Sequence, residues 1–304
     1  MPPALAIVGV TACGKSALAL DVARRLGDAE IISVDSMQVY REMDIGTAKP
    51  TDAERDEVRH HLIDVADPSQ DYSLTMFQQA ARQARSEIAD RGRAAVLVGG
   101  TGLYLRAVID DLEIPGRFPE TEAVLEEEPD TEALHRRLGE LDPVAAARMA
   151  PTNRRRIIRA LEVTVGSGRP FSSYGPGLST YPPRDTLQIG LRLSRAEIDR
   201  RIEQRCRQQM ADGFLAEAEA LASRRPPLSR TASQALGYRE LLAHLNGQMS
   251  LDEAVALAVT RTRRFARRQE RWFRRDPRII WLDADAESLA GQVISRCSPH
   301  LART

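Results

Sequence analysis

The chain has 304 residues, with 43 Lys and Arg against 43 Asp and Glu, so its formal net charge is zero. Such a length suits one large domain with an insertion, or two modest domains. Three widely spaced cysteines, Cys13, Cys206 and Cys297, argue against a disulfide framework or a structural zinc site. No apolar run approaches the roughly 20 residues that cross a membrane, and the first strand pattern leaves no room for a signal peptide, so we expect a cytoplasmic protein.

The first motif along the chain is a phosphate-binding loop. Residues 9–16 fit the pattern G-x-x-x-x-G-K-[ST], after a buried-strand pattern and before a helical pattern at 15–26. Its glycines let successive backbone N–H groups converge on an anion at a helix N-terminus. Lys15 adds a positive charge, and the Ser16 hydroxyl is placed to ligate Mg²⁺. We expect a di- or triphosphate to be bound by the whole loop: Gly9, Val10, Thr11, Ala12, Cys13, Gly14, Lys15 and Ser16.

Strand and helix patterns alternate through the rest of the first third. Residues 29–34 and 94–98 resemble buried parallel strands, and residues 73–90 have helical periodicity. The fold class predicted is therefore α/β, a P-loop NTPase-like parallel sheet flanked by helices. Residues 115–185 lack a convincing strand and are predicted to form an all-helical insertion domain between two parts of the core, 1–114 and 186–304. In the second part, strands are expected at 187–193 and 279–282, with helices from 195 to 273.

Two strand ends carry candidate catalytic groups. Asp35 follows the second strand, where the carboxyl ends of parallel strands line a ligand crevice. It could act as a base, organise a metal or merely cap the next helix. Thr101 lies in a Gly-Gly-Thr-Gly turn after the next strand, and its residue type alone favours a helix N-cap. His60 and His61 are adjacent and share no face, which favours a structural role over metal binding.

The C-terminal third contains a stripe of basic side chains at helical spacing. Aligned guanidinium groups repel one another unless an anion is near, which favours RNA or DNA as a partner. Phe265 and Trp272 lie on a neighbouring face and can dock the helix to the core. A second basic cluster opens a helix of the insertion, where positive charge opposes the helix dipole. The stripe comprises Arg261, Arg264, Arg268, Arg271 and Arg275, and the cluster comprises Arg154, Arg155, Arg156 and Arg159.

An ordered set of motifs resembles the bacterial tRNA dimethylallyltransferases, the isopentenyl-tRNA transferase family, over essentially the whole chain. The set is more specific than any one member. It consists of residues 9–16, 32–40, 44–50, 61–64, 97–104, 159–163 and 237–239, together with Arg268, Gln269 and Trp272. Val10 and Cys13 depart from the Pro and Ser usual in that family's loop, which could alter its affinity or redox sensitivity.

The resemblance implies prenylation of the N6 amine of the adenosine that follows the anticodon, with dimethylallyl diphosphate as donor and Mg²⁺ as cofactor. By that resemblance the loop holds the prenyl diphosphate, Asp35 is the base, and Thr101 helps to place the reacting groups. The expected partners are tRNA and dimethylallyl diphosphate, with no membrane, and we expect a monomer. The tRNA-contacting residues implied are Asp35, Ser36, Met37, Gln38, Arg155, Arg156, Ile157, Ile158, Arg159, Gln234, Gly237, Tyr238, Arg239, Arg267, Arg268, Gln269, Arg271, Trp272 and Arg274.

Three other functions share parts of this pattern. A nucleotide or small-molecule kinase would have the loop, the sheet and a helical lid, but would leave the arginine stripe unexplained. A non-catalytic RNA-binding NTPase would make Asp35 and Thr101 ordinary switch or cap residues. An adenylate isopentenyltransferase would act on a free nucleotide, which does not need so wide a cationic surface.

Overall fold

The computed structural model describes residues 4–301, which fall into two compact units. The core unit consists of Met1–Asp110 with Pro183–Thr304, and the helical unit is Asp111–Pro182. The limits of the helical unit differ by a few residues at each end from the 115–185 expected for the insertion.

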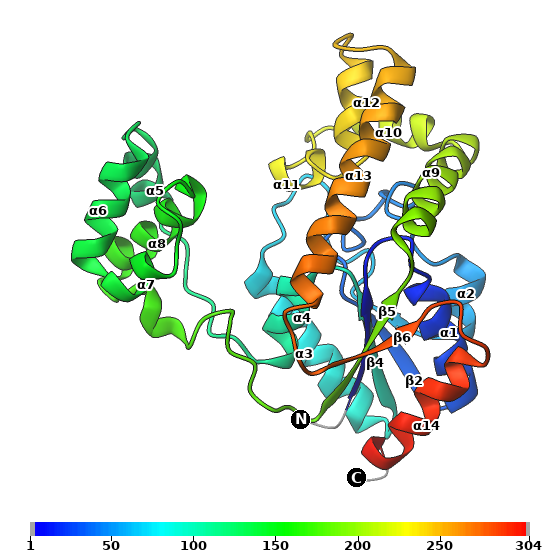
Figure 1. The fold of residues 1–304 in the computed structure, drawn as a ribbon. Coiled ribbons are helices and arrows are strands. Elements are labelled where there is room, and N and C mark those ends of the chain that lie inside the picture. Colours follow the sequence, from blue (N-terminus) through cyan, green and yellow to red (C-terminus); the bar gives the residue numbers. More distant parts are fainter. Residues whose placement is uncertain (1–3, 302–304) are drawn as a thin grey trace. The chain divides into compact units, whose positions relative to one another are not determined.

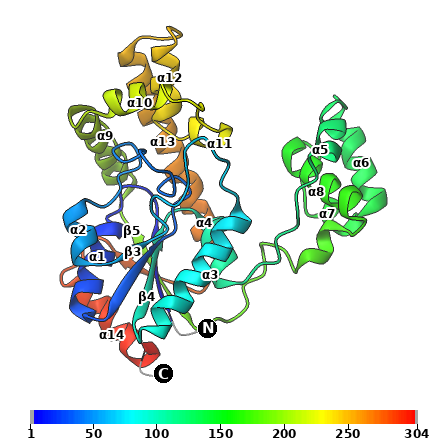
Figure 2. The same ribbon diagram turned by 180° about the vertical axis from the view of Figure 1, so that it is seen from behind.

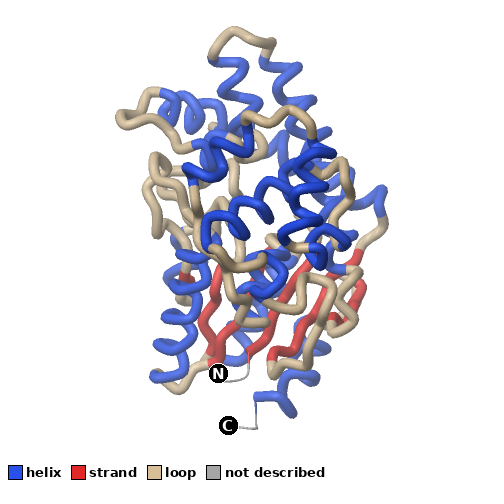
Figure 3. Tube along the Cα trace, turned by 90° about the vertical axis from the view of Figure 1, so that its left-hand side faces the viewer, coloured by secondary structure: helices blue, strands red, loops and turns tan. Residues whose placement is uncertain are grey.

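The core unit is built on a six-stranded parallel sheet in the order β3-β2-β4-β1-β5-β6. This confirms the predicted α/β class, and Figure 3 shows the strands (red) side by side with helices around them. The strands are β1 (Ala4–Gly9), β2 (Ala29–Ser33), β3 (His60–His61), β4 (Ala94–Gly99), β5 (Thr186–Arg192) and β6 (Ile279–Asp283). The edge strand β3 has only two residues and was not predicted.

The central strand β1 alternates its side chains between two apolar layers. Ala4, Ala6 and Val8 join the layer that contains buried side chains of α3 (Leu74–Asp90) and α4 (Gly102–Ile109). Leu5 and Ile7 join the opposite layer, with α1 (Lys15–Leu26) and α14 (Leu289–Leu301). Figures 1 and 2 show these helix pairs on the two sides of the strands. Both faces of β1 are therefore buried, as its unbroken apolar sequence predicts.

Further helices of the core unit lie over the carboxyl ends of the strands, where the site is expected (Figures 1 and 2). The stretch expected to be helical from 195 to 273 is broken into separate helices of very different length. They are α9 (Arg195–Ala211), α10 (Phe214–Ala222), α11 (Arg230–Ser233), α12 (Tyr238–Leu245) and α13 (Leu251–Phe273), and the short α2 (Asp52–Glu57) precedes β3.

The helical unit has a small apolar core of its own. Leu125, Leu134, Leu138, Ile157 and Leu161 are buried there together. Its elements are α5 (Pro119–Glu126), α6 (Thr131–Leu141), α7 (Pro143–Ala147), α8 (Arg154–Ser167) and the 3₁₀ turn η1 (Phe171–Tyr174). The buried Asp142 joins two of these, because its side chain accepts hydrogen bonds from the N–H of Ala145 at 2.9 Å and of Ser172 at 2.7 Å.

A buried carboxylate ties the edge of the sheet to neighbouring loops. The Glu30 side chain on β2 is fully buried, and it accepts two hydrogen bonds from Arg91, at 2.9 and 2.7 Å. His61 of β3 contacts the same carboxylate at 2.6 Å, so this histidine has the structural role expected from its sequence. Burial would raise the pKa of Glu30, but the hydrogen bonds from Arg91 and His61 outweigh it and lower the pKa to about 2.

Replacement of this carboxylate should cost stability in a way that depends on pH. In the unfolded chain the Glu30 carboxylate is protonated with the ordinary pKa of 4.5. In the folded chain it stays ionised until the pH falls to its lowered pKa of about 2. The stabilisation is therefore complete above pH 5 and is lost as the pH falls toward 2. We expect Glu30→Gln to lower the free energy of unfolding by about 3 kcal/mol at pH 7 and by much less at pH 3, measured by urea titration. A difference that does not change with pH would contradict this assignment.

Candidate active site

The phosphate-binding loop presents a row of free backbone donors. Gly14, with φ of 92°, precedes α1, and Ala12 has a φ of 63°. Within residues 4–301, none of the N–H groups of residues 12–16 donates a hydrogen bond. The Lys15 ammonium contacts only the carbonyl oxygen of Val10, at 3.1 Å, and has no carboxylate partner in this part of the chain. Such a concavity of donors at a helix N-terminus is the kind of arrangement that binds phosphate oxygens.

The Ser16 hydroxyl fits a magnesium ligand by its surroundings. The residue is exposed in the first turn of α1, and its hydroxyl has no hydrogen-bond partner among the described residues. No group of three or more His, Cys, Asp or Glu side chains that could hold a metal occurs in residues 4–301. A single hydroxyl beside a phosphate site suits Mg²⁺, which takes few protein ligands and completes its shell with phosphate oxygens and water.

The turn between β4 and α4 lies against two other segments, too closely for side chains of its own. A Cβ on Gly99 would overlap the backbone of Val34, and one on Gly100 would overlap the side-chain amide of Gln269. A Cβ on Gly102 would overlap the indole ring of Trp272. The glycines at 99, 100 and 102 therefore allow the end of β2 and the helix α13 to lie directly on the turn that carries Thr101.

Asp35 and Thr101 are held on neighbouring backbone segments, and neither caps a helix with its side chain. One carboxylate oxygen of Asp35 accepts from the N–H of Met37 at 2.9 Å. The Thr101 hydroxyl oxygen accepts from the N–H of Ser36 at 3.3 Å, and it makes no cap bond to α4 although Thr101 occupies the N-cap position. Thr101 is therefore the N-cap residue of α4 by position, as expected, but not through its side chain, and Asp35 bonds within a turn and not at a helix start. Within the described chain, the second Asp35 oxygen and the Thr101 hydroxyl proton remain free for a substrate.

A further basic residue, Arg205, reaches the same place from α9. Its guanidinium donates to the Thr11 hydroxyl at 2.7 Å and has no ion pair with a described carboxylate. Burial lowers the pKa of Arg205, while the charge of Asp35 opposes that shift. Arg205 was not predicted from the sequence, because α9 carries arginines throughout and its helical spacing alone does not single out position 205.

The expected tRNA contacts of α12 and α13 fall into two classes. Tyr238 and Gln269 are 1% and 6% exposed, and their polar groups bond inside the protein, so in this structure their side chains are not available to RNA. Trp272 is partly buried against the turn at Gly102, and Gly237 is buried. Gln234 and Arg239 remain accessible, joined by a hydrogen bond of 3.3 Å.

Tyr238 belongs to a network that fixes the loop at residues 44–50. The carboxylate of Glu217 accepts from Tyr238 at 2.6 Å and from the N–H groups of Asp44, Ile45 and Gly46, at 2.8 to 3.2 Å. Burial, reinforced by the Glu217 charge, raises the pKa of Tyr238, so its phenol stays protonated as a donor. This long loop is therefore held in a fixed position on the core unit.

Gln38 is also used inside the protein, although Asp35, Ser36 and Met37 beside it keep the strand-end position expected of them. Its amide oxygen accepts from Ser33 at 2.7 Å, and its nitrogen donates to the carbonyl groups of Thr47 and Ala48, at 3.2 and 3.1 Å. Gln38 thereby fastens the end of β2 to the 44–50 loop, and the sequence-based contact with tRNA does not include its amide in this arrangement.

The arginines near the C-terminal end of α13 separate by their partners. Arg261, expected on the stripe, pairs with the buried Glu240, and Arg274 pairs with Glu270 at 2.7 Å. Arg263 pairs with Glu203 at 3.0 Å, and the five other arginines of this stretch are exposed and have no ion-pair partner among residues 4–301. We call this set the free arginine face: Arg264, Arg267, Arg268, Arg271 and Arg275.

The basic cluster of the helical unit also contains arginines bonded within the protein and arginines without a partner. Arg154 donates to the carbonyl groups of Glu126 and Glu128, and Arg159 pairs with the buried Glu162 at 2.8 Å. Ile157 and Ile158, which were also expected to contact tRNA, have their side chains buried in the core of the unit. Only Arg155 and Arg156 of this cluster are exposed and without a partner in the described chain.

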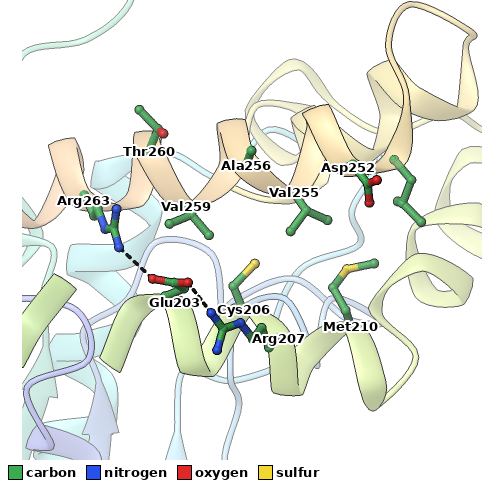
Figure 4. Close-up of a pocket in the computed structure, with 11 residues that line it drawn as sticks. Glu203, Cys206, Arg207, Met210, Asp252, Val255, Ala256, Val259, Thr260 and Arg263 are labelled. Atoms are coloured by element: carbon green, nitrogen blue, oxygen red, sulfur yellow. Dashed lines mark hydrogen bonds and ion pairs between the residues drawn. The ribbon is translucent and has the colours of Figure 1, made fainter. Parts of the chain in front are cut away.

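A groove of about 620 Å³ lies between α9 and α13 (Figure 4). Its floor is apolar, with Met210 and Val259 among the lining residues, and Glu203 and Arg263 form an ion pair of 3.0 Å across it. None of the residues that line it is a predicted site residue. The two helices thus present different faces to this groove and to the phosphate-binding loop.

Comparisons with known proteins point to one family. The profile of the IPP transferase family matches residues 38–276. The tRNA dimethylallyltransferases of Bifidobacterium animalis subsp. lactis and Streptomyces coelicolor are each 48% identical, over 92% of this chain and 82% and 90% of theirs. The crystal structure of a tRNA isopentenylpyrophosphate transferase from Bacillus halodurans covers all of this chain, and this chain covers 98% of it, at 38% identity and a TM-score of 0.73.

A structure of a eukaryotic dimethylallyltransferase acting on tRNA is similar over all of this chain and 77% of its own length, at 25% identity and a TM-score of 0.76. Among the described residues, no helix is long and apolar enough to span a membrane. Family profile, curated relatives and solved structures agree over nearly the whole length. The chain belongs to the IPP transferase family.

Proposed function

We propose that this protein transfers a dimethylallyl group from dimethylallyl diphosphate to the N6 amine of the adenosine 3′-adjacent to the anticodon in tRNA. The products are the N6-dimethylallyl adenosine and diphosphate. One observation supports this most: the loop with free backbone donors is joined through Gln269 to the turn that carries Thr101, where a carboxylate and a hydroxyl are both held by backbone contacts and both keep a free atom for a substrate.

The donor side of the reaction is supported by the loop. Breaking the allylic C–O bond sends the electron pair to the departing diphosphate, whose growing charge needs stabilisation. The N–H groups of residues 12–16, the Lys15 ammonium and the Arg205 guanidinium are the donors available there. A Mg²⁺ ion held by Ser16 and the phosphate oxygens would add charge neutralisation.

The acceptor side is supported by Asp35 and Thr101. The N6 amine forms a bond to the allylic carbon and loses a proton, for which the free oxygen of Asp35 is a suitable acceptor. Thr101 can donate its hydroxyl proton to the bridging oxygen or to the base. The adenine must leave the anticodon stack to reach these groups, because its amine is inaccessible when stacked.

The free arginine face and the pair Arg155 and Arg156 are the surfaces proposed for the RNA backbone. They provide charge without internal partners, which is what phosphate contacts require. The donor site, the base and the basic face belong to one chain, so we propose that a monomer acts, in the cytoplasm where tRNA occurs.

The reaction is tested with labelled dimethylallyl diphosphate, Mg²⁺ and unmodified tRNA. We expect the label in RNA, at the adenosine beside the anticodon. Label in AMP but not in tRNA would instead identify an adenylate isopentenyltransferase, and phosphate release from ATP without prenyl transfer would identify an NTPase or kinase.

Loss of the proposed base should stop the chemistry but spare binding. We expect Asp35→Asn to lower kcat by about 10²- to 10⁴-fold, because general-base catalysis contributes on that order. Filter binding should show tRNA affinity within a few-fold of the wild type. The exposed Asp28, between α1 and β2, offers the matched control Asp28→Asn, which should keep full activity. Weak tRNA binding by Asp35→Asn with normal kcat would refute the role.

Arg205 should matter for the prenyl donor. We expect Arg205→Gln to raise KM for dimethylallyl diphosphate by about 10- to 100-fold, since a hydrogen bond to a charged group contributes about 1.5 to 3 kcal/mol. KM for tRNA should change little. Arg207→Gln, two residues along α9 and paired with Glu203 instead, is the control and should leave both constants near the wild type. Equal effects of the two variants would argue against a diphosphate contact.

The free arginine face should determine the salt dependence of tRNA binding. We expect Arg271→Gln to weaken binding at low salt and to reduce the slope of log Kd against log salt by about 1, as loss of one phosphate contact does. Arg200→Gln removes another exposed arginine, which pairs with Glu197, and its slope should match the wild type. An unchanged slope for Arg271→Gln would place the RNA elsewhere.

A further inference from the structure

We infer that Gln269 is a positioning residue, whose side-chain amide fixes the distance between the diphosphate-binding loop and the turn that carries Thr101. This inference rests on the proposed function. It replaces the contact with tRNA that the sequence suggested for Gln269, because a side chain that is 6% exposed has its amide turned inward.

The amide joins two segments that are far apart in the chain. Its oxygen accepts from the N–H of Thr11 at 2.8 Å, and its nitrogen donates to the carbonyl oxygen of Gly100 at 2.9 Å. The orientation of the amide is settled by its partners, because a backbone N–H can only donate and a carbonyl oxygen can only accept. No other neutral side chain of this length offers both a donor and an acceptor.

These two hydrogen bonds set the geometry of the reaction. Thr11 belongs to the loop proposed to hold the leaving diphosphate, and Gly100 precedes Thr101 on the turn beside Asp35. Transfer requires the amine, the allylic carbon and the departing oxygen to be in line, and a misplacement of about 1 Å can cost about 100-fold in rate. Trp272 packs on Gly102 less than one turn further along α13, so the helix contacts the turn on both sides of Thr101.

The amide is not proposed to touch either substrate. Neither of its hydrogen bonds uses the N–H groups of residues 12–16, and the free arginine face is exposed. A defect in Gln269 should therefore act on kcat and spare the KM values of both substrates, unlike the loss of a binding residue.

The first test is Gln269→Met, which keeps the length of the side chain but removes both hydrogen bonds. We expect kcat to fall about 10- to 100-fold, with KM for dimethylallyl diphosphate and for tRNA within about 3-fold of the wild type. Gln83→Met on the outer side of α3, an exposed glutamine paired with Glu87, is the control and should keep full activity. Thermal unfolding of both variants checks that the protein folds.

The second test is Gln269→Glu, whose effect on kcat should depend on pH, as a general loss of packing would not. The ionised carboxylate still accepts from Thr11 but repels the carbonyl oxygen of Gly100, whereas the protonated acid restores a donor to that oxygen. We expect the ratio of its kcat to that of the wild type to rise as the pH is lowered from 8.5 toward 6. For Gln269→Met the same ratio should stay constant.

The outcomes separate the possible errors. A wild-type enzyme that transfers no prenyl group overturns the proposed function itself. With an active wild type, normal kcat for Gln269→Met, a raised KM for tRNA alone, or a pH-independent ratio for Gln269→Glu each overturn the positioning role.

Discussion

The site depends on the absence of side chains in one short turn. Because the glycines at 99, 100 and 102 leave no Cβ, the backbone of Val34, the amide of Gln269 and the ring of Trp272 all reach the turn directly. A single methyl group at any of these positions would push one of the segments away, since packed interiors absorb little added volume. The relative placement of Asp35 and Thr101 follows from this contact, not from a bond between them.

Although the net charge of the chain is zero, its arginines differ in their partners: some pair with buried carboxylates and others have no carboxylate partner. Buried carboxylates such as Glu30, Glu162 and Glu240 each bind one or more guanidinium groups, and these pairs hold strands, loops and helices together. Burial of such a carboxylate is tolerable only with its partners in place. The arginines without a carboxylate partner in the described chain include those of the free arginine face and Arg155 and Arg156 at the start of α8. The number of arginines available to an external anion therefore depends on how many are bound by carboxylates of the protein itself.

Local pattern was enough to predict the sheet, the phosphate-binding loop and the inserted helices, because apolar runs, glycine spacing and helical periodicity are short-range signals. It was not enough to sort side chains by direction. Tyr238, Gln269 and Ile157 lie in stretches predicted to bind RNA, yet they are buried. This is because successive residues of one helix turn point to opposite sides of the helix. Arg205 was missed for the converse reason: its contact with Thr11 joins residues that are 194 positions apart.

The two-part core has a consequence for synthesis on the ribosome. The central strand β1 pairs with β4 on one side and with β5 on the other, and β5 follows the whole helical unit in the chain. At about 5 to 20 residues per second, β5 leaves the ribosome about 10 to 40 seconds after β1. During that interval one edge of the nascent sheet is unpaired and apolar, whereas the helical unit already has all of its own core residues. The insertion can therefore fold before the domain into which it is inserted.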